Sequence, residues 1–261
     1  MHYFLSGPSG IGKTRFGNWL ANRGYDHVLV DPGDGSFRLP RELIDPWQRR
    51  DFEGIANELD NRAKAQGKAK GFRVVDAPVS GGDVGAINAT LSIMVGGDPD
   101  DVAAALPILE SVGKTIVHVG PAGAGQTVKA ANQLIVAGTI ELVAESIVVL
   151  EAYGVDMPAA IKVLAGGLAG NQILERKAAG MLKREFAPGF RIDLHHKDMG
   201  IVTSAAREAG VAIPLGALTA QLVGAARAQG HGSLDHSALL LLVEQLSGRS
   251  SDDTGSTTKE A

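Results

Sequence analysis

At residues 123–133 the sequence reads Gly-Ala-Gly-Gln-Thr-Val-Lys-Ala-Ala-Asn-Gln, and a nearly apolar segment follows. The glycines open a run composed mostly of Ala, Val, Ile and Leu, which predicts a long, largely buried helix over 125–153. Lys129, Asn132 and Gln133 stand at i, i+3 and i+4, so their side chains share one face of this helix. The stretch therefore combines the start of a core helix with a polar face that a core does not need.

Lys129 stands out in this stretch because a lysine near the start of a helix has the wrong sign for the helix dipole. Burial and the positive end of a helix both lower the pKa of a lysine toward neutrality, which suits a catalytic acid. The alternative is a lysine whose stem is buried while its ammonium reaches water at the helix end. Spacing alone leaves both interpretations open.

The pattern of elements changes near residue 121. Before it, strands are predicted at 3–6, 27–30, 72–75, 90–95 and 115–119, and helices at 13–22, 58–66 and 98–111. After it, further helices are predicted at 157–165, 171–182, 193–209, 213–229 and 235–246. We therefore expect an α/β Rossmann-like or P-loop-like unit over 1–120, an all-helical domain over 121–247, and a disordered tail over 248–261.

Composition excludes several classes of function. The chain has 261 residues, a net charge of −4 and no cysteine, which excludes disulfides, zinc–thiolate sites and thiol catalysis and argues against a nucleic-acid partner. The start of the chain lacks a signal-peptide pattern, and the uninterrupted apolar runs are too short to span a membrane. The adjacent His195 and His196 cannot share a helix face, so we expect no metal site. A cytoplasmic protein without a membrane partner is the resulting expectation.

Four segments, in this order, resemble motifs of the β-hydroxyacid dehydrogenase family. They are Asp76-Ala77-Pro78-Val79-Ser80-Gly81-Gly82, the stretch at 123–133, Phe186 to Leu194 followed by Lys197-Asp198, and Asp235-His236-Ser237-Ala238-Leu239. The resemblance implies an NAD(H)- or NADP(H)-dependent oxidoreductase. It would reduce 2-hydroxy-3-oxopropionate (tartronate semialdehyde) to glycerate, or act on a closely related 3-oxo or 3-hydroxy acid. The resemblance also implies a homodimer or a higher homo-oligomer.

The resemblance assigns roles to particular residues. Lys129 is the implied catalytic proton donor, and Lys197 is the implied lysine near the cofactor. The implied substrate-binding residues are Ser80, Gly81, Gly82 and Asn132. Elementary chemistry agrees, because glycines let a backbone approach an anion closely and a carbonyl under reduction needs a proton.

Each assignment has a purely structural alternative. The Ser80-Gly81-Gly82 segment is equally typical of an ordinary turn. Asn132 could form a hydrogen bond between helices without touching a substrate. Lys197 could be a solvated lysine that pairs with Asp193, four residues earlier.

A different motif opens the chain. Residues 7–14 read Gly-Pro-Ser-Gly-Ile-Gly-Lys-Thr and fit the phosphate-binding loop G-x-x-x-x-G-K-[ST]. In such a loop Lys13 would contact phosphate oxygens and Thr14 would bind Mg²⁺, so the segment resembles the start of a P-loop kinase that binds ATP with magnesium.

The same residues nearly fit a dinucleotide fingerprint. Gly7 and Gly12 have the spacing of the outer glycines, but Ser9 stands where the middle glycine is expected. Asp31 ends the second predicted strand, where an acid would bind the adenosine ribose and favour NAD. Three hypotheses remain: a reductase, a P-loop ATP-binding kinase-like protein, and a catalytically impaired dimerisation module.

Overall fold

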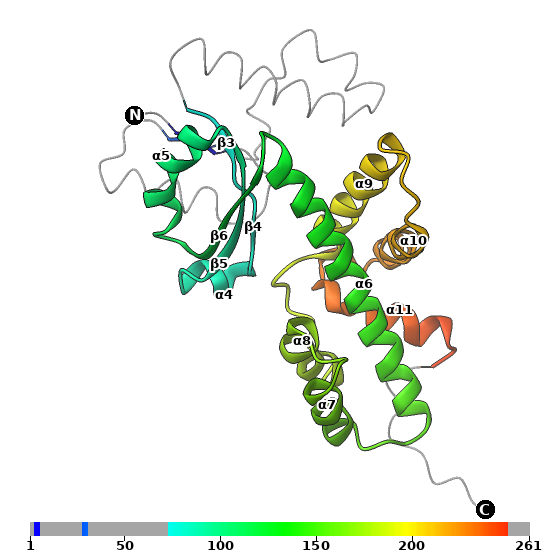
Figure 1. Cartoon of the computed structure of the whole chain (residues 1–261). Helices are drawn as coiled ribbons and strands as arrows, with labels where there is room; N and C mark the ends of the chain where they lie inside the picture. Colours follow the sequence, from blue (N-terminus) through cyan, green and yellow to red (C-terminus); the bar gives the residue numbers. More distant parts are fainter. Residues whose placement is uncertain (1–2, 6–27, 31–72, 250–261) are drawn as a thin grey trace, which may run out of the picture. The chain divides into compact units, whose positions relative to one another are not determined.

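The computed structural model of the chain describes residues 3–5, 28–30 and 73–249 (Figure 1). The chain forms two compact units, Met1–Lys129 and Ala130–Ala261, and each is described by itself. The division falls inside helix α6 (Ala124–Ala152), whereas the boundary predicted from sequence precedes that helix. The predicted helices at 13–22 and 58–66, and nearly all of the predicted tail, lie outside the described residues.

The described part of the first unit contains two parallel strand pairs. β1 (Tyr3–Leu5) pairs in parallel with β2 (Val28–Val30). In a second sheet β5 (Leu91–Gly97) pairs in parallel with β6 (Gly113–Gly120), and α5 (Pro99–Leu109) connects them. This strand–helix–strand connection is the building block of an α/β fold.

The other edge of β5 carries one interrupted strand. β3 (Val75–Asp76) and β4 (Val79–Ser80) both pair antiparallel with β5, with Asp76 opposite Gly96 and Ser80 opposite Ser92. Pro78 lies between them and has no N–H to donate, which interrupts the ladder. Its carbonyl still accepts the Met94 amide at 3.0 Å, so the segment stays on the sheet.

The core of the first unit forms between α5 and β5. Alternate residues of β5 point to one face, and α5 covers that face. The buried residues of this cluster are Leu91, Ile93, Val95, Val102, Ala105 and Leu109. The predicted strands at 90–95 and 115–119 and the predicted helix at 98–111 correspond to these elements, whereas β4 and α4 (Gly82–Ile87) were not expected.

Helices make up the described part of the second unit after α6. They are α7 (Met157–Gly166), α8 (Gln172–Leu182), α9 (Ile192–Glu208), α10 (Pro214–Ala228) and α11 (Leu239–Leu246), with 3-10 turns η2 (His231–Ser233) and η3 (His236–Ala238). Side chains cap the N-termini of several of these helices. At the start of α8, Asn171 accepts the amides of Ile173 and Leu174 at 2.9 Å each. Gly210 and Gly230 have positive φ and follow α9 and α10, as a helix end requires.

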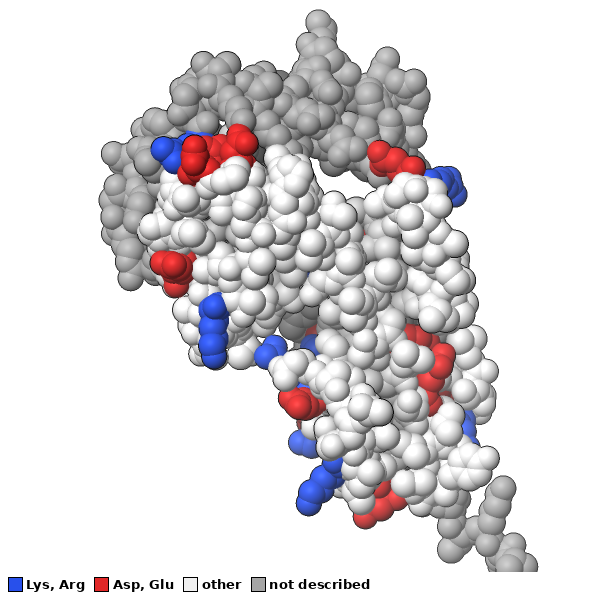
Figure 2. All heavy atoms as spheres, in the orientation of Figure 1, with Lys and Arg blue, Asp and Glu red and all other residues white. Residues whose placement is uncertain are grey.

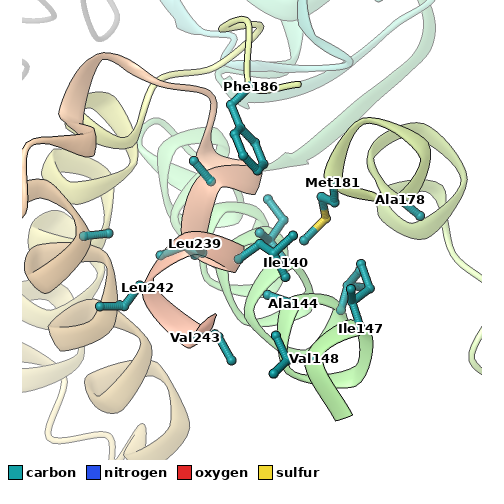
Figure 3. Close-up of a cluster of buried hydrophobic side chains, with 14 of the residues drawn as sticks. Ile140, Ala144, Ile147, Val148, Ala178, Met181, Phe186, Leu239, Leu242 and Val243 are labelled. Carbon is teal, nitrogen blue, oxygen red and sulfur yellow. The ribbon is translucent and has the colours of Figure 1, made fainter. Parts of the chain in front are cut away.

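α6 supplies the central face of the core of this unit. Ile140, Ala144 and Ile147 lie at helical spacing and point toward Met181 of α8 and Leu239 of α11 (Figure 3). By length and composition α6 could cross a membrane, which the lengths of the uninterrupted apolar runs do not indicate. Because these inward side chains are buried among other helices, we interpret α6 as a core helix.

The core geometry predicts a large cost for truncating Leu239. This side chain is 0% exposed, so Leu239→Ala should lower the free energy of unfolding by about 3 kcal/mol through lost burial and a cavity. Leu215→Ala is the matched control, because Leu215 is 77% exposed and its truncation should cost less than about 0.5 kcal/mol. Urea unfolding followed by circular dichroism measures both, and equal costs would contradict the assigned core.

Candidate active site

The predicted proton donor lies against the predicted substrate segment. The Lys129 ammonium donates to the main-chain oxygen of Val79 at 2.9 Å, and the lysine is half-buried. Val79 and Ser80 together form β4, so this contact brings the lysine to the residue next to Ser80. All three residues belong to the first unit.

The segment after β4 turns on two glycines. Gly81 has a φ of 132° and Gly82 a φ of 65°, in the left-handed region that favours glycine. A Cβ at Gly81 would also come within 3.2 Å of the Leu91 side chain, while one at Gly82 would meet no described atom within 4 Å. The backbone at Gly82 is therefore open to a ligand in the part of the chain that the structure describes.

A chain of polar contacts joins α6 to α9 within the second unit. The Asn132 side chain donates to Gln133 Oε1 at 2.9 Å, and the Gln133 amide donates to Asp198 Oδ2 at 2.6 Å. The other oxygen of Asp198 lies 2.7 Å from the Lys197 ammonium. Two residues predicted from the resemblance, Asn132 and Lys197, are thus connected through Gln133 and Asp198.

The alternative that pairs Lys197 with Asp193 is wrong. Asp193 forms its ion pair with Arg227 at 2.8 Å, whereas Lys197 pairs with its neighbour Asp198. One turn of helix separates Asp193 from Lys197, but Asp198 is the more buried carboxylate.

Two histidines, His195 and His236, are buried in this network. His195 Nε2 lies 3.2 Å from the Gln133 main-chain oxygen, and His195 Nδ1 lies 3.1 Å from His236 Nδ1. A carbonyl oxygen only accepts, so His195 donates from Nε2 and accepts at Nδ1 from His236. Burial, followed by the neighbouring His195, lowers the pKa of His236 to about 3, although the charge of Asp235 opposes the shift.

A pattern in α9 could have revealed the burial of His195. His195 stands three residues after the buried Ile192, and four residues before the buried Met199. It therefore falls on the apolar face of α9. A comparison of His195 with its neighbour His196 alone does not reveal this position.

Asp235 is the structural centre of the last predicted motif. Its carboxylate accepts from the Lys177 ammonium at 2.9 Å, from the amides of Gly189 and Phe190, and from the Ser237 hydroxyl at 2.7 Å. Burial alone would raise the pKa of Asp235, but the charge of His236, the Lys177 ammonium and the Ser237 hydroxyl lower it well below its usual value. Asp235 is also the N-cap of η3, since it accepts the Ser237 amide at 3.1 Å.

Charged side chains of both signs are scattered over the visible face of the described residues, and most of that face is uncharged (Figure 2). Glu141 and Glu244 are also buried. Glu141 of α6 is 5% exposed, and burial, followed by the charge of Glu145, raises its pKa to about 7.

The remaining predicted residues, namely Gly7, Gly12, Lys13, Thr14 and Asp31, lie outside the described residues. The described part of the first unit nevertheless fits a dinucleotide in one respect. Gly120 ends β6 and Gly123 follows it, at the carboxyl end of a strand, where α/β sheets bind ligands, and both glycines have positive φ. A Cβ at Gly123 would meet no described atom within 4 Å.

Comparison with known proteins identifies the family. Residues 51–120 match the NAD binding domain of 6-phosphogluconate dehydrogenase, and residues 123–243 match the NAD-binding family of NADP-dependent 3-hydroxyisobutyrate dehydrogenase. The uncharacterized oxidoreductase YkwC of Bacillus subtilis is 39% identical over 223 residues, which cover 85% of this chain and 71% of YkwC. The chain belongs to the β-hydroxyacid dehydrogenase family. This membership confirms the predicted family and fold class.

Members of the β-hydroxyacid dehydrogenase family with assigned activities are also similar. The 2-hydroxy-3-oxopropionate reductase of Escherichia coli is 40% identical over 201 residues, covering 77% of this chain and 65% of that enzyme. A 3-hydroxyisobutyrate dehydrogenase structure from Mycobacterium tuberculosis has a TM-score of 0.63 at 33% identity, covering 70% of this chain and 65% of that one. One from Salmonella typhimurium has a TM-score of 0.66 at 25% identity, covering 72% and 65%.

The matches cover only part of the relatives' length, but they include both cofactor-binding family models. It spans between 60% and 65% of the length of three of the curated relatives it matches. NAD(H) or NADP(H) is confirmed as the cofactor class of its family. Both family matches begin after residue 50, so the P-loop interpretation of residues 7–14 gains no support from them and stays a prediction.

The buried acid on α6 predicts a pH-dependent stability. The folded chain holds the Glu141 proton up to about pH 7, whereas the unfolded chain releases it near pH 4.5. The contribution of Glu141 to the free energy of unfolding therefore falls as the pH rises between these two values. Glu141→Gln mimics the protonated acid and should stabilise the fold at pH 8.5 by roughly 2 kcal/mol, with little effect at pH 4.5.

Thermal melts at the two pH values test this prediction. Glu185→Gln is the matched control, because Glu185 is exposed and its replacement should change stability equally little at both. A Glu141→Gln effect that is the same at pH 4.5 and pH 8.5 would show that Glu141 is ionised in the fold at neutral pH.

Proposed function

We propose that this chain takes part in NAD(H)- or NADP(H)-dependent reduction of a small 3-oxo acid. The observation that carries the proposal is the 2.9 Å contact of the Lys129 ammonium with Val79, next to Ser80 and the two left-handed glycines. The first substrate to test is 2-hydroxy-3-oxopropionate, which would become glycerate. The similarity to the E. coli 2-hydroxy-3-oxopropionate reductase supports that choice.

Lys129 is the proposed proton donor. Hydride from the nicotinamide would make the substrate carbonyl oxygen negative, and an ammonium beside that oxygen can give it a proton. The Val79 contact holds the ammonium on the segment that precedes the substrate-binding residues. Stabilising charge where it develops is a general source of catalysis.

The carboxylate of the substrate is the proposed ligand of Ser80, Gly81 and Gly82. A serine hydroxyl and backbone amides beside glycines can donate to an anion without a bulky side chain in the way. Asn132 is the proposed partner of the substrate hydroxyl. Its contact with Gln133 fixes the amide orientation, because Gln133 Oε1 accepts from Asn132 Nδ2.

The proposed cofactor residues lie in two parts of the chain. Gly7 and Gly12 would allow the pyrophosphate to approach the backbone, and Asp31 would accept from the adenosine ribose and favour NAD. Lys197 would contribute a positive charge near the cofactor, and its pairing with Asp198 limits its movement.

The substrate itself remains a proposal because the relatives carry different names. They include 2-(hydroxymethyl)glutarate dehydrogenase of Eubacterium barkeri, 3-sulfolactaldehyde reductase of E. coli and NAD-dependent L-serine dehydrogenase of Pseudomonas aeruginosa. These names share a small polar molecule with an acidic group, but the acidic group is a sulfonate in 3-sulfolactaldehyde and a carboxylate in the others. A substrate panel should therefore vary both the acidic group and the other substituents.

A homodimer or a higher homo-oligomer in the cytoplasm is the proposed state. Ile135, Leu142 and Val149 of α6 are exposed at seven-residue spacing, so they form an apolar stripe along one side of the helix. A stripe of this kind is typical of a helix that packs against another chain.

Two other functions stay as alternatives. The motif at 7–14 favours Mg²⁺-dependent ATP binding through Lys13 and Thr14. A dimerisation module derived from the reductase would bind neither nucleotide. Calorimetry separates the three: the reductase binds NADH or NADPH, the kinase-like protein binds Mg-ATP in a manner abolished by Lys13→Ala, and the module binds none of them.

The reductase proposal predicts a specific effect of removing Lys129. Lys129→Ala should lower kcat with 2-hydroxy-3-oxopropionate by roughly 100- to 10,000-fold, because general acid catalysis is lost. The affinity for NADH should stay within about twofold, since the lysine serves the chemical step rather than cofactor binding.

Lys162→Ala is the matched control, because Lys162 is an exposed lysine of α7. Its kcat should equal that of the unmodified protein. NADH oxidation at 340 nm gives the rates, and calorimetry gives the affinities. Full activity of Lys129→Ala would exclude the proposed proton donor.

A further inference from the structure

The carboxylate of Asp76 forms the cap of the helix that carries Lys129. Asp76 Oδ1 accepts the Gly123 amide at 2.6 Å, and Oδ2 accepts the Gln126 amide at 3.0 Å. These are orphan donors at the start of α6, which no earlier turn of the helix can satisfy. The cap therefore comes from β3, 47 and 50 residues earlier in the chain.

Two glycines make room for this cap. A Cβ at Gly96 would lie 2.5 Å from Asp76 Oδ1, and one at Gly125 would lie 2.6 Å from Oδ2 and 2.4 Å from the Met94 main-chain oxygen. Only glycine at both positions lets the carboxylate reach the amides while α6 begins directly against β5. The first turn of α6 is thus fitted to the sheet around a single side chain.

A second contact ties the same two segments. Lys129 lies in the second turn of α6 and donates to Val79, three residues after Asp76. Residues 76–79 and the first turns of α6 are therefore joined at both ends, by a carboxylate at one end and by the proposed proton donor at the other. A displacement of either segment would change the position of the ammonium relative to Ser80.

We propose that Asp76 is a positioning residue, which fixes the start of α6 against residues 76–79 and thereby places Lys129 beside the substrate-binding segment. This inference rests on the proposed reductase function for its catalytic consequence, but its structural content stands by itself. The carboxylate also places a negative charge at the helix start, where it offsets the dipole that disfavours a lysine there. With both oxygens bonded to α6 amides, Asp76 serves the helix rather than the substrate.

The test compares Asp76→Asn and Asp76→Ala with Asp101→Asn. Asp101 of α5 is the matched control. Its carboxylate also accepts a backbone amide of this unit, that of Val74 at 3.3 Å, but this contact does not involve α6. The first readout is the rate of reductive methylation of Lys129 by formaldehyde and a borane, followed by peptide mass spectrometry. Both Asp76 variants should raise this rate by about threefold or more, while Asp101→Asn leaves it unchanged.

A second readout uses the unmodified protein and needs no variant to fold. The amides of Gly123 and Gln126 should exchange with deuterium far more slowly than uncapped first-turn amides, because Asp76 holds both. Exchange of both at the rate of an unstructured peptide would overturn the proposal. Unchanged Lys129 methylation in the Asp76 variants, or an equal rise in Asp101→Asn, would overturn it as well.

The third readout is kinetic and depends on the proposed function. In Asp76→Asn, kcat should fall by about tenfold or more through misplacement of Lys129, while KM for NADH stays within about twofold. Equal losses of kcat in Asp76→Asn and Asp101→Asn would overturn the positioning role. If the unmodified protein shows no reductase activity, the proposed function fails, and methylation and exchange alone decide whether Asp76 fixes the helix.

Discussion

One carboxylate determines how the long helix of this protein begins. Without Asp76, the Gly123 and Gln126 amides would have no partner from within the helix, and α6 would start away from the sheet or fray. The crowding at Gly96 and Gly125 shows that the sheet and the helix start are shaped around this contact. Because Lys129 lies on the next turns of the same helix, its position is a consequence of the cap.

The network of the second unit shows a related use of buried polar groups. The contact of His195 with the Gln133 carbonyl joins α9 to α6, and its contact with His236, whose pKa is lowered by burial, joins α9 to η3. Two carboxylates next to these groups, Asp235 and Asp198, each pair with a lysine, Lys177 and Lys197. Buried polar groups of this kind fix orientation when every member has a partner.

Local sequence was sufficient for the elements with strong periodicity. The alternation in β5 and the apolar spacing in α6 specify a strand and a core helix regardless of distant contacts. β4 and α4 are too short to carry such a pattern, and the cap by Asp76 joins residues 47 apart, so neither could be read from a window of sequence. The candidate site follows the same rule. Family motifs indicated Lys129 and Ser80, whereas the capping role of Asp76 depends on contacts with residues 47 and 50 positions later in the chain.

The polar residues of α6 that could contact a substrate lie near its N-terminus. Lys129, Asn132 and Gln133 lie in its first turns, and each has a partner from β4, from α9 or on the helix itself. From Leu134 to Ile140 the helix is apolar apart from Thr139, and its inward face packs in the hydrophobic core. A site for a small charged acid can therefore use α6 only at its beginning, which is also where a capping carboxylate can make a lysine tolerable. The requirement for a well-placed ammonium and the requirement for a well-capped helix thus meet in the same two turns.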